Sequence, residues 1–356
     1  MANPLTQDVL VDPVVLTRAL VDLQSVSREE KEIADCVEEV LRQAPHLSVD
    51  RLGNTVMART DLGREQRVVL AGHLDTVPIN DNFPSTVQDD LIFGCGTSDM
   101  KSGVALALHL AATLPDPRYD LTFLFYEAEE IDSRYNGLRL LAEDRPEWLR
   151  ADFAVLLEPT YGIVEAGCQG TLRALVRTTG RRAHTARAWR GVNAIHAMGD
   201  LLQRLKDYRP RTVAIDGCTY REGLNAVRIS GGVAGNVVPD ACEIEVNLRF
   251  APDRTEKQAL EHVHEVFEGF DVELTDSAPG AMPGLGAAPA REFLAAVGEQ
   301  PDAKLGWTDV ARFAALGIPA LNYGPGDPLL AHAPDEHVEI GKIRDGAATL
   351  HRWLAL

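Results

Sequence analysis

Short apolar runs alternate along the chain with segments in which apolar residues return every three or four positions. The runs are too short for helices and too continuously apolar for strands with one wet face, so they predict the buried strands of a parallel sheet. The helical pattern is clearest over residues 100–114, where Pro115 stops the helix. We expect further helices at 14–24 and 29–43, and buried strands at 67–72, 121–126, 153–157 and 318–323.

The order of elements changes near residue 172. From there the pattern predicts a strand, a helix, two strands, a helix and a strand, which is the order of the split, ferredoxin-like α+β unit. A segment rich in proline, glycine and alanine at 278–290 then leads back to the first kind of pattern. The expected segments are 172–178, 188–208, 226–233, 241–250, 256–267 and 271–275.

The fold class that follows is α/β, with a mostly parallel sheet in the larger domain and a smaller α+β domain inserted into it. A chain of 356 residues is long enough for such a pair. We expect residues 1–173 and 285–356 to form the two parts of the larger domain and residues 174–284 to form the insertion.

The charge balance narrows the classes of partner. The chain has 35 lysines and arginines against 53 aspartates and glutamates, a net charge of −18, and no basic run, which argues against a nucleic-acid-binding protein. No apolar run approaches about 18 residues and the N-terminus lacks a leader pattern, so we expect a cytoplasmic protein without membrane association. The five cysteines include no CxxC pair, and we expect reduced thiols, with Cys95 a small buried thiol rather than a nucleophile.

Candidate metal ligands follow every one of the expected buried strands. Ligands bind open α/β sheets beyond the carboxyl ends of the strands, so side chains that follow different strands there meet at one edge. Asp99 occupies a comparable place, because it opens the helix expected at 100–114. The residues concerned are His73, Asp75, Asp99, Glu129, Glu130, Glu158 and His332.

Each of these residues has an ordinary structural interpretation when it is taken alone. His73 and Asp75 form an HxD triplet, which arises often by chance, and the glutamate pair at 129–130 fits the solvated first turn of a helix. His332 alone fits a plain loop histidine. Glu158 is the least ordinary, because a carboxylate at the end of an apolar strand needs a partner, and a metal ion supplies one. The shared position at the ends of successive strands favours the metal site.

The types of ligand narrow the choice of metal. Imidazoles and carboxylates without thiolates suit zinc, manganese or cobalt. Two histidines and three carboxylates exceed the needs of one tetrahedral ion and suit two ions about 3.5–4 Å apart that share a carboxylate and a water molecule. Asp75 lies two residues from His73 and so on the same side of an extended segment, where it can orient the imidazole. One glutamate is then left over, as a general base requires.

A series of motifs gives the chain a resemblance to a known family. The motifs are GHLDTVP (72–78), GCGTSDMKSG (94–103), EAEE (127–130), LEPT (157–160), GRRAHTA (180–186), GNVVPDACEIEVNLRF (235–250) and AHAPDEH (331–337). Through them the chain is similar over nearly its whole length to the dinuclear-zinc aminoacylases and exopeptidases, which include acetylornithine deacetylase and succinyl-diaminopimelate desuccinylase. The resemblance implies a zinc-exopeptidase-like catalytic domain with an inserted dimerisation and lid domain.

The resemblance implies two zinc ions, for which cobalt or manganese can substitute, and a role for each candidate ligand. One carboxylate bridges the ions, each ion has a histidine and a glutamate of its own, and the remaining glutamate is the general base. These roles fall to His73 and Glu158 for one ion, Glu130 and His332 for the other, Asp99 as the bridge, Glu129 as the base and Asp75 as the residue that orients the first histidine.

The resemblance also implies residues that meet the substrate. His184 would stabilise the oxyanion and, as in relatives, would reach across a dimer interface. Arg249 and Asn236 match positions that hold the substrate, and an arginine fork suits a carboxylate. Backbone N–H groups around Gly324 would meet a succinyl carboxylate. Without the resemblance, these residues are an exposed histidine, a strand arginine, a turn asparagine and a loop glycine.

The expected reaction is hydrolysis of the amide bond of a small N-acyl amino acid by a homodimer. We favour removal of succinate from N-succinyl-LL-2,6-diaminopimelate, on the route to lysine and diaminopimelate, because EEIDSRYNGL (129–138) resembles the desuccinylases of this family. The alternative is an N-acetylornithine deacetylase or a broader N-acyl-amino-acid amidohydrolase, and TDVAR (308–312) departs from the TSDGR of desuccinylases. A binding protein without turnover would have lost a ligand or the base, and all of these residues are present.

Overall fold

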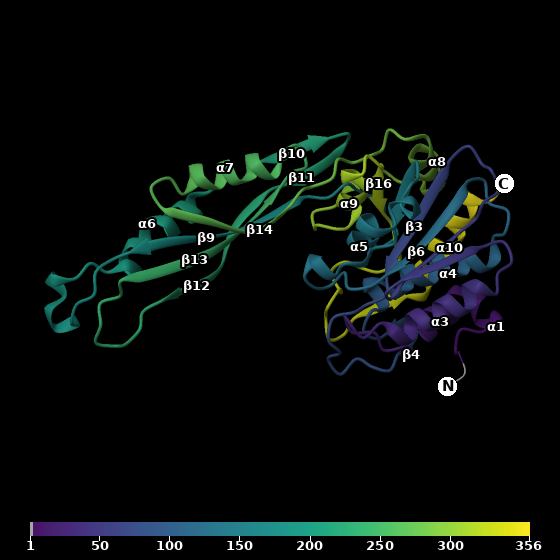
Figure 1. The fold of residues 1–356 in the computed structure, drawn as a ribbon, viewed down its shortest axis with the longest axis horizontal. Coiled ribbons are helices and arrows are strands. Elements are labelled where there is room, and N and C mark those ends of the chain that lie inside the picture. Colours follow the sequence, from purple (N-terminus) through teal and green to yellow (C-terminus); the bar gives the residue numbers. More distant parts are fainter. Residues whose placement is uncertain (1–2) are drawn as a thin grey trace. The chain divides into compact units, whose positions relative to one another are not determined.

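The computed structural model describes residues 3–356 of the chain and divides into two compact units. The first unit runs through Ala166 and includes Pro283–Asp302 and Arg312–Leu356, and the second contains Gly167–Met282 and Ala303–Ala311. Figure 1 shows the course of the chain through these units. The assignment of catalytic and lid domains, with boundaries at 174 and 284, stays a prediction.

The first unit is built on an eight-stranded sheet in the order β1-β2-β6-β3-β7-β16-β8-β15 (Figure 1). Its middle strands are parallel, since β3 pairs with β6 and β7, and β7 pairs with β16. Every residue of β6 is buried, as is nearly all of β3, which confirms the prediction of buried parallel strands. These strands are β3 (Arg67–His73), β6 (Asp120–Tyr126), β7 (Phe153–Leu156) and β16 (Ala320–Asn322).

Antiparallel strands extend this sheet on both sides, which makes it mixed rather than purely parallel. The hairpin of β1 and β2 turns through Gly53 and Asn54 and pairs with β6. On the other side, β8 pairs with β16. The added strands are β1 (Ser48–Leu52), β2 (Thr55–Arg59), β8 (Glu165–Ala166) and β15 (Asp302–Ala303).

The helices of the first unit bury a large apolar core against the sheet. Helix α4 contacts β3 as well as α2 and α10, and its side chains are buried almost all round. Helix α2 begins where the Asp12 side chain accepts hydrogen bonds from the N–H groups of Val14 and Val15. The helices are α1 (Gln7–Leu10), α2 (Pro13–Val21), α3 (Lys31–Arg42), α4 (Ser102–Thr113), α5 (Gly137–Asp144), α8 (Ala288–Val297) and α10 (Ile340–Leu354), and α9 (Val310–Ala315) begins in the second unit and ends in the first.

A second, three-stranded sheet joins segments that are far apart in the sequence. Its order is β17-β5-β4, and β17 (His337–Glu339) pairs with β5 (Leu91–Phe93), which pairs with β4 (Thr86–Gln88). The small sheet therefore brings the segment after His332 beside the loop that carries Asp99.

The second unit is the predicted ferredoxin-like arrangement. Its strands are antiparallel in the order β12-β13-β9-β14, and one face of β9 and β13 is buried, because their burial alternates along the chain. Helices α6 and α7 pack against this sheet. The elements are β9 (Gly170–Thr179), α6 (Ala194–Asp207), β12 (Gly223–Gly231), β13 (Ala241–Phe250), α7 (Glu256–Val266) and β14 (Asp271–Ala278).

Two local features of this unit differ from the prediction. The helix expected at 188–208 begins only at Ala194, where Asn193 caps it, and a 3-10 turn occupies Thr185–Arg190. A hairpin of β10 (Thr212–Ile215) and β11 (Cys218–Arg221) was not predicted. The segment expected as a linker at 278–290 does contain the return to the first unit, at Pro283, although the last residue of β14 and the start of α8 also fall within it. Within residues 3–356, every helix is too short or too polar to cross a membrane.

Candidate metal centre

His73 ends strand β3 and is almost fully buried. Its Nδ1 lies 3.0 Å from the backbone oxygen of Asp75 and 3.5 Å from the Oδ1 atom of the same residue. Its Nε2 lies 3.1 Å from Oδ1 of Asp99. The ring is thus held on one side and presents Nε2 to Asp99, although the shorter contact of Nδ1 is with the Asp75 backbone and not with its carboxylate.

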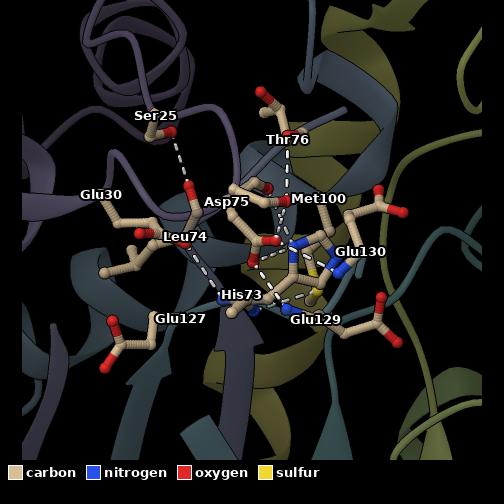
Figure 2. Close-up of polar contacts among 12 residues, drawn as sticks. Ser25, Glu30, His73, Leu74, Asp75, Thr76, Met100, Glu127, Glu129 and Glu130 are labelled. Carbon is tan, nitrogen blue, oxygen red and sulfur yellow. Dashed lines mark hydrogen bonds and ion pairs between the residues drawn. The ribbon is translucent and has the colours of Figure 1, made fainter. Parts of the chain in front are cut away.

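The Asp75 carboxylate holds the loop that follows the neighbouring strand β6. Its Oδ1 accepts the N–H of Glu129 at 3.0 Å, and its Oδ2 accepts the N–H of Glu130 at 3.1 Å and the hydroxyl of Ser27 at 2.7 Å. Figure 2 shows the side chains of both glutamates leaving to the same side, away from Asp75. Asp75 therefore positions the two glutamates through their backbone, and they do not form the first turn of a helix.

Hydrogen bonds to two other segments also hold the loop that carries these glutamates. Ala128 has a φ of 58°, a left-handed conformation that a residue other than glycine seldom adopts. Its N–H donates to Oε1 of the buried Glu30 at 3.1 Å, and Glu127 accepts the N–H of Asn54 at 2.8 Å. Such strained backbone persists only where the surroundings enforce it, and it clusters at functional sites.

Asp99 lies in an extended loop, which corrects the expectation that it opens a helix. Its φ and ψ are −118° and 95°, the peptide bond to Met100 is cis, and α4 begins only at Ser102. Its Oδ1 lies 3.1 Å from His73 Nε2 and its Oδ2 lies 3.5 Å from His332 Nε2. The carboxylate therefore lies between two histidines, as a bridging ligand would.

Glu336 explains why this loop is extended. Its carboxylate is 2% exposed and accepts the N–H groups of Gly96, Ser98 and Asp99 at 3.0, 2.9 and 3.0 Å. Burial raises the pKa of Glu336 to about 7, although the three N–H groups oppose that shift. Because Glu336 follows His332 by four residues, it ties the Asp99 loop to the His332 loop. The sequence analysis missed this role, although Glu336 lies inside the AHAPDEH motif.

His332 approaches the same carboxylates from the exposed side. Its Nε2 lies 3.0 Å from Oε1 of Glu130, and its side chain is 50% exposed whereas that of Glu130 is 8% exposed. Hydrogen bonds to Asp99 and Glu130 raise the pKa of His332 to about 10, because they outweigh the effect of burial. Its φ of 65° is a second left-handed conformation at the site.

These residues fit a metal site. His73, Asp99 and Glu130 each offer a ligand atom, and the three atoms lie within 4.8 Å of one another. Burial lowers the pKa of His73, but hydrogen bonds to Asp75 and Asp99 raise it well above its usual value. The imidazoles thus hold protons against carboxylates, in positions where a divalent cation would replace those protons. Nitrogen and oxygen donors without thiolates suit zinc, manganese or cobalt.

Glu158 follows β7 at the same level of the sheet as His73 follows β3. Ala71 pairs with Leu156 in the parallel register, and His73 and Glu158 each come two residues later. Glu158 is 5% exposed. The register of the strands therefore agrees with Glu158 as a metal ligand. Its role as a ligand stays a prediction.

Gly324 has a structural reason to be glycine. Its N–H donates to the hydroxyl of Thr160 at 3.0 Å, and a Cβ there would lie 2.5 Å from the carbonyl oxygens of Leu157 and Glu158. The strand end that carries Glu158 thus requires this close approach. Because the Gly324 N–H already has an acceptor, a substrate carboxylate would need another donor in this loop, and the substrate role of Gly324 stays a prediction.

The three candidate residues of the second unit fall into two places. His184 pairs with Val237, its Nδ1 accepts the N–H of Ala186 at 3.1 Å, and the backbone oxygen of Asn236 accepts the N–H of Thr185 at 3.0 Å. His184 and Asn236 are therefore neighbours. Arg249 is near the other end of β13, about 27 Å from the strand's first residue.

Arg249 is half-buried and is paired in the ladder with Thr171 and Gly223. Burial and the nearby Arg173 lower the pKa of Arg249. Among residues 3–356, Arg249 makes no ion pair with a carboxylate of the chain. Its guanidinium group is therefore available to an anionic ligand.

Cys95 fits the description of a small buried thiol. Its Sγ lies 3.6 Å from the backbone oxygen of Val77, and burial raises the pKa of the thiol. A raised pKa leaves little thiolate near neutral pH, which is unfavourable for a nucleophile.

Comparison with known proteins identifies the family of the chain. The family model of peptidase family M20/M25/M40 matches residues 69–356. A Mycobacterium tuberculosis protein named "Putative succinyl-diaminopimelate desuccinylase DapE" is 58% identical over 350 residues, which cover 98% of this chain and 99% of that protein. The succinyl-diaminopimelate desuccinylase of Corynebacterium glutamicum is 50% identical, over 98% of this chain and 97% of its own.

The fold has relatives among solved structures. The Bacillus subtilis YXEP protein, described as a dinuclear metal binding peptidase from the M20 family, matches with a TM-score of 0.70 at 16% identity over 98% of each chain. The mixed sheet of the first unit and the ferredoxin-like second unit agree with this likeness in fold. The chain belongs to peptidase family M20/M25/M40.

Proposed function

We propose that the chain hydrolyses N-succinyl-LL-2,6-diaminopimelate to succinate and LL-2,6-diaminopimelate. The observation that carries the proposal is the convergence of His73, Asp99 and Glu130 beside Glu129, in a chain 58% and 50% identical to proteins named for this reaction. Identity at that level over nearly the whole chain favours this substrate over N-acetylornithine.

The proposed cofactor is a pair of divalent cations, zinc by preference. His73 and Glu158 would hold one cation, Glu130 and His332 the other, and Asp99 would be shared. The register of β3 and β7 and the position of Asp99 between two histidines support this assignment. Bound cations would supply the positive charge that makes a water molecule acidic enough to attack an amide at neutral pH.

Glu129 is the proposed general base. It accepts a proton from the attacking water, the remaining hydroxide adds to the amide carbon, and the C–N bond breaks as Glu129 returns that proton to the leaving nitrogen. The products are then a carboxylic acid and an amine, with no atom unaccounted for. Support comes from Asp75, which accepts the N–H of Glu129 and so positions Glu129. The Glu129 side chain itself is half-buried.

The proposed working form is a homodimer in which His184 serves the metal centre of a second copy and stabilises the oxyanion. Strand β9 runs from Gly170, three residues after the second unit begins, to Thr179, about 30 Å further on. His184 follows that far end. This separation from the junction with the first unit supports action on another subunit.

The edge of the second unit's sheet supports a dimer too. Strand β12 is an edge strand, and its Val227 and Ile229 are 58% and 54% exposed. Ile195 and Leu202 of the adjacent α6 add further exposed apolar side chains. An exposed apolar edge strand invites pairing with another chain.

The test is kcat/KM of the zinc-loaded protein on N-succinyl-LL-2,6-diaminopimelate and on N-acetylornithine. We expect a preference of at least a hundredfold for the succinyl substrate, which corresponds to about 2.7 kcal/mol in transition-state binding. The reverse preference would overturn the proposed substrate and leave the assignment of ligands and base unaffected.

A further inference from the structure

The second unit contains a basic cavity that the proposed function does not yet use. The cavity has a volume of about 580 Å³ and no acidic side chain lines it. We call it the arginine pocket. Its lining residues are Arg181, Arg182, Ala183, His184, Arg187 and Arg190.

The four arginines of the pocket differ in what they already bind. Arg182 is paired with Asp240 at 2.7 Å, and Arg181 donates through Nε to the backbone oxygen of Arg190 at 2.9 Å. The guanidinium groups of Arg187 and Arg190 make no ion pair with any carboxylate among residues 3–356. Both guanidinium groups are therefore available to an anionic ligand in a pocket without acidic side chains.

The backbone holds this segment as a closed loop. Arg181 and Val192 pair through two reciprocal N–H to oxygen bonds of 2.8 and 3.0 Å. Gly191 closes the loop at a point where a Cβ would lie 2.8 Å from the Arg181 oxygen. The loop is tied to the Asn236 segment through Thr185 and Val238. The backbone positions of His184, Arg187 and Arg190 relative to one another are thus set before a ligand arrives, which lowers the cost of binding.

We infer that Arg187 and Arg190 bind a carboxylate of the substrate while His184 meets the carbonyl of the scissile amide. The inference rests on the proposed function and on the proposed role of His184. N-succinyl-LL-2,6-diaminopimelate carries three carboxylates, one at the end of the succinyl group and one on each α-carbon. Planar arginine forks recognise carboxylates through paired N–H bonds, and the absence of acidic side chains in the pocket leaves both forks free to do so.

The carboxylate that Arg187 and Arg190 bind is either that of the succinyl group or one of the two α-carboxylates. All three offer an arginine the same pair of oxygen atoms. Substrates in which a single carboxylate is replaced by a carboxamide distinguish these sources, because an amide keeps the shape and removes the charge. The measurement is kcat/KM of wild type and of the double variant Arg187→Gln/Arg190→Gln on the parent compound and on each monoamide.

We expect the double variant to lose about a hundredfold in kcat/KM on the parent compound. On the monoamide that lacks the contacted carboxylate, wild type should itself be slow, and the double variant should differ from it by less than threefold. On the other monoamides the hundredfold loss should remain. The variant Arg187→Lys/Arg190→Lys, which keeps the charge without the fork, should fall between wild type and the glutamine variant.

Arg221→Gln is the matched control. Arg221 is an exposed arginine of the same unit, on strand β11 and outside the pocket lining, so its loss should change kcat/KM by less than twofold on every substrate. Thermal unfolding of each variant shows whether the loop still folds.

The outcomes separate the two hypotheses. A wild-type enzyme that fails to hydrolyse N-succinyl-LL-2,6-diaminopimelate overturns the proposed function. A wild type that is active, combined with a double variant that loses less than threefold or loses equally on every monoamide, overturns the role of Arg187 and Arg190 alone.

Discussion

The two sets of candidate residues differ in how firmly their own unit holds them. In the first unit, His73 and Asp75 are buried, and the glutamate loop is bonded to Asp75 and Glu30. In the second unit, His184 is exposed, and its ring accepts a hydrogen bond from the N–H of Ala186 in the same loop.

This contrast indicates different roles for the two sets of residues. Buried, mutually bonded side chains suit a metal centre, where the positions of ligands must be accurate before the ion arrives. Exposed side chains on a closed loop suit recognition, where the substrate or a second subunit completes the contacts. We therefore expect changes in the first unit to alter metal binding or the chemical step, and changes in the second to alter substrate recognition and assembly.

The largest effect should come from Glu129→Gln. The variant removes the proposed base and leaves the backbone bond to Asp75 in place, so metal content should be unchanged while kcat falls by about 10³-fold or more. Metal analysis and steady-state kinetics measure the two quantities on the same sample. Glu127→Gln is the control, because the Glu127 side chain points away from Glu129 (Figure 2) and accepts from Asn54, and it should change kcat by less than threefold. Activity retained in Glu129→Gln would contradict the assignment of the base.

His184→Ala should lower kcat by about a hundredfold without changing metal content. If His184 serves a second copy, mixing His184→Ala with Glu129→Ala subunits should restore about a quarter of wild-type activity, because half of the dimers are mixed and each has one intact site. His196→Ala, an exposed histidine on α6, should have no effect and controls for the loss of an imidazole. Confirmed subunit exchange without rescue would count against action between subunits.

Glu336→Gln should weaken metal binding by about 10- to 100-fold. An amide can accept with only one of its two ends, so at least one of the N–H groups of Gly96, Ser98 and Asp99 loses its partner and the Asp99 loop loosens. Zinc affinity, measured by competition with a chelator, tests the expectation. Glu339→Gln, which alters a nearby half-buried carboxylate bonded to Tyr161, should leave the affinity unchanged. Equal affinities for wild type and Glu336→Gln would show that this carboxylate does not position the ligand.

Metal affinity should also depend on pH. The pKa of His332 is raised to about 10 and that of His73 is also raised, so in the metal-free protein both rings hold protons near neutral pH. A cation must displace these protons, and affinity should therefore rise with pH, by about tenfold per unit for each proton released. Calorimetry between pH 6 and 8 in buffers of different ionisation enthalpy counts the protons. An affinity that stays level over this range would contradict the coupling.

The parallel strands of the first unit were predictable because their signal is local and strong. A short, fully apolar run has few alternatives to a buried strand, and the side chains that follow such runs meet at one edge of the sheet by geometry. The proposals for His73, Glu130 and Glu158 rest on this argument. His332 and Asp99 came from the same argument with less support, since each lies in a loop.

The hairpins were missed although their turns carry a signal. The turn of β1 and β2 is Gly53-Asn54, and that of β10 and β11 is Asp216-Gly217, both of which are typical two-residue turns. Their strands are only four or five residues long and largely half-exposed or exposed, except for β2, so the hydrophobic pattern is weak. Turn residues deserve more weight than strand pattern in such segments.

Residue types and their order were sufficient to predict the fold class, because it depends on local pattern, and they are the basis for the proposed metal ligands and base, because these follow the ends of strands. Contacts between distant segments governed the details. The Asp99 loop is extended because Glu336, more than two hundred residues away in sequence, binds its N–H groups, and no local preference could reveal that. Asp75 likewise serves the glutamate loop more closely than it serves His73, since folding brings that loop to its carboxylate.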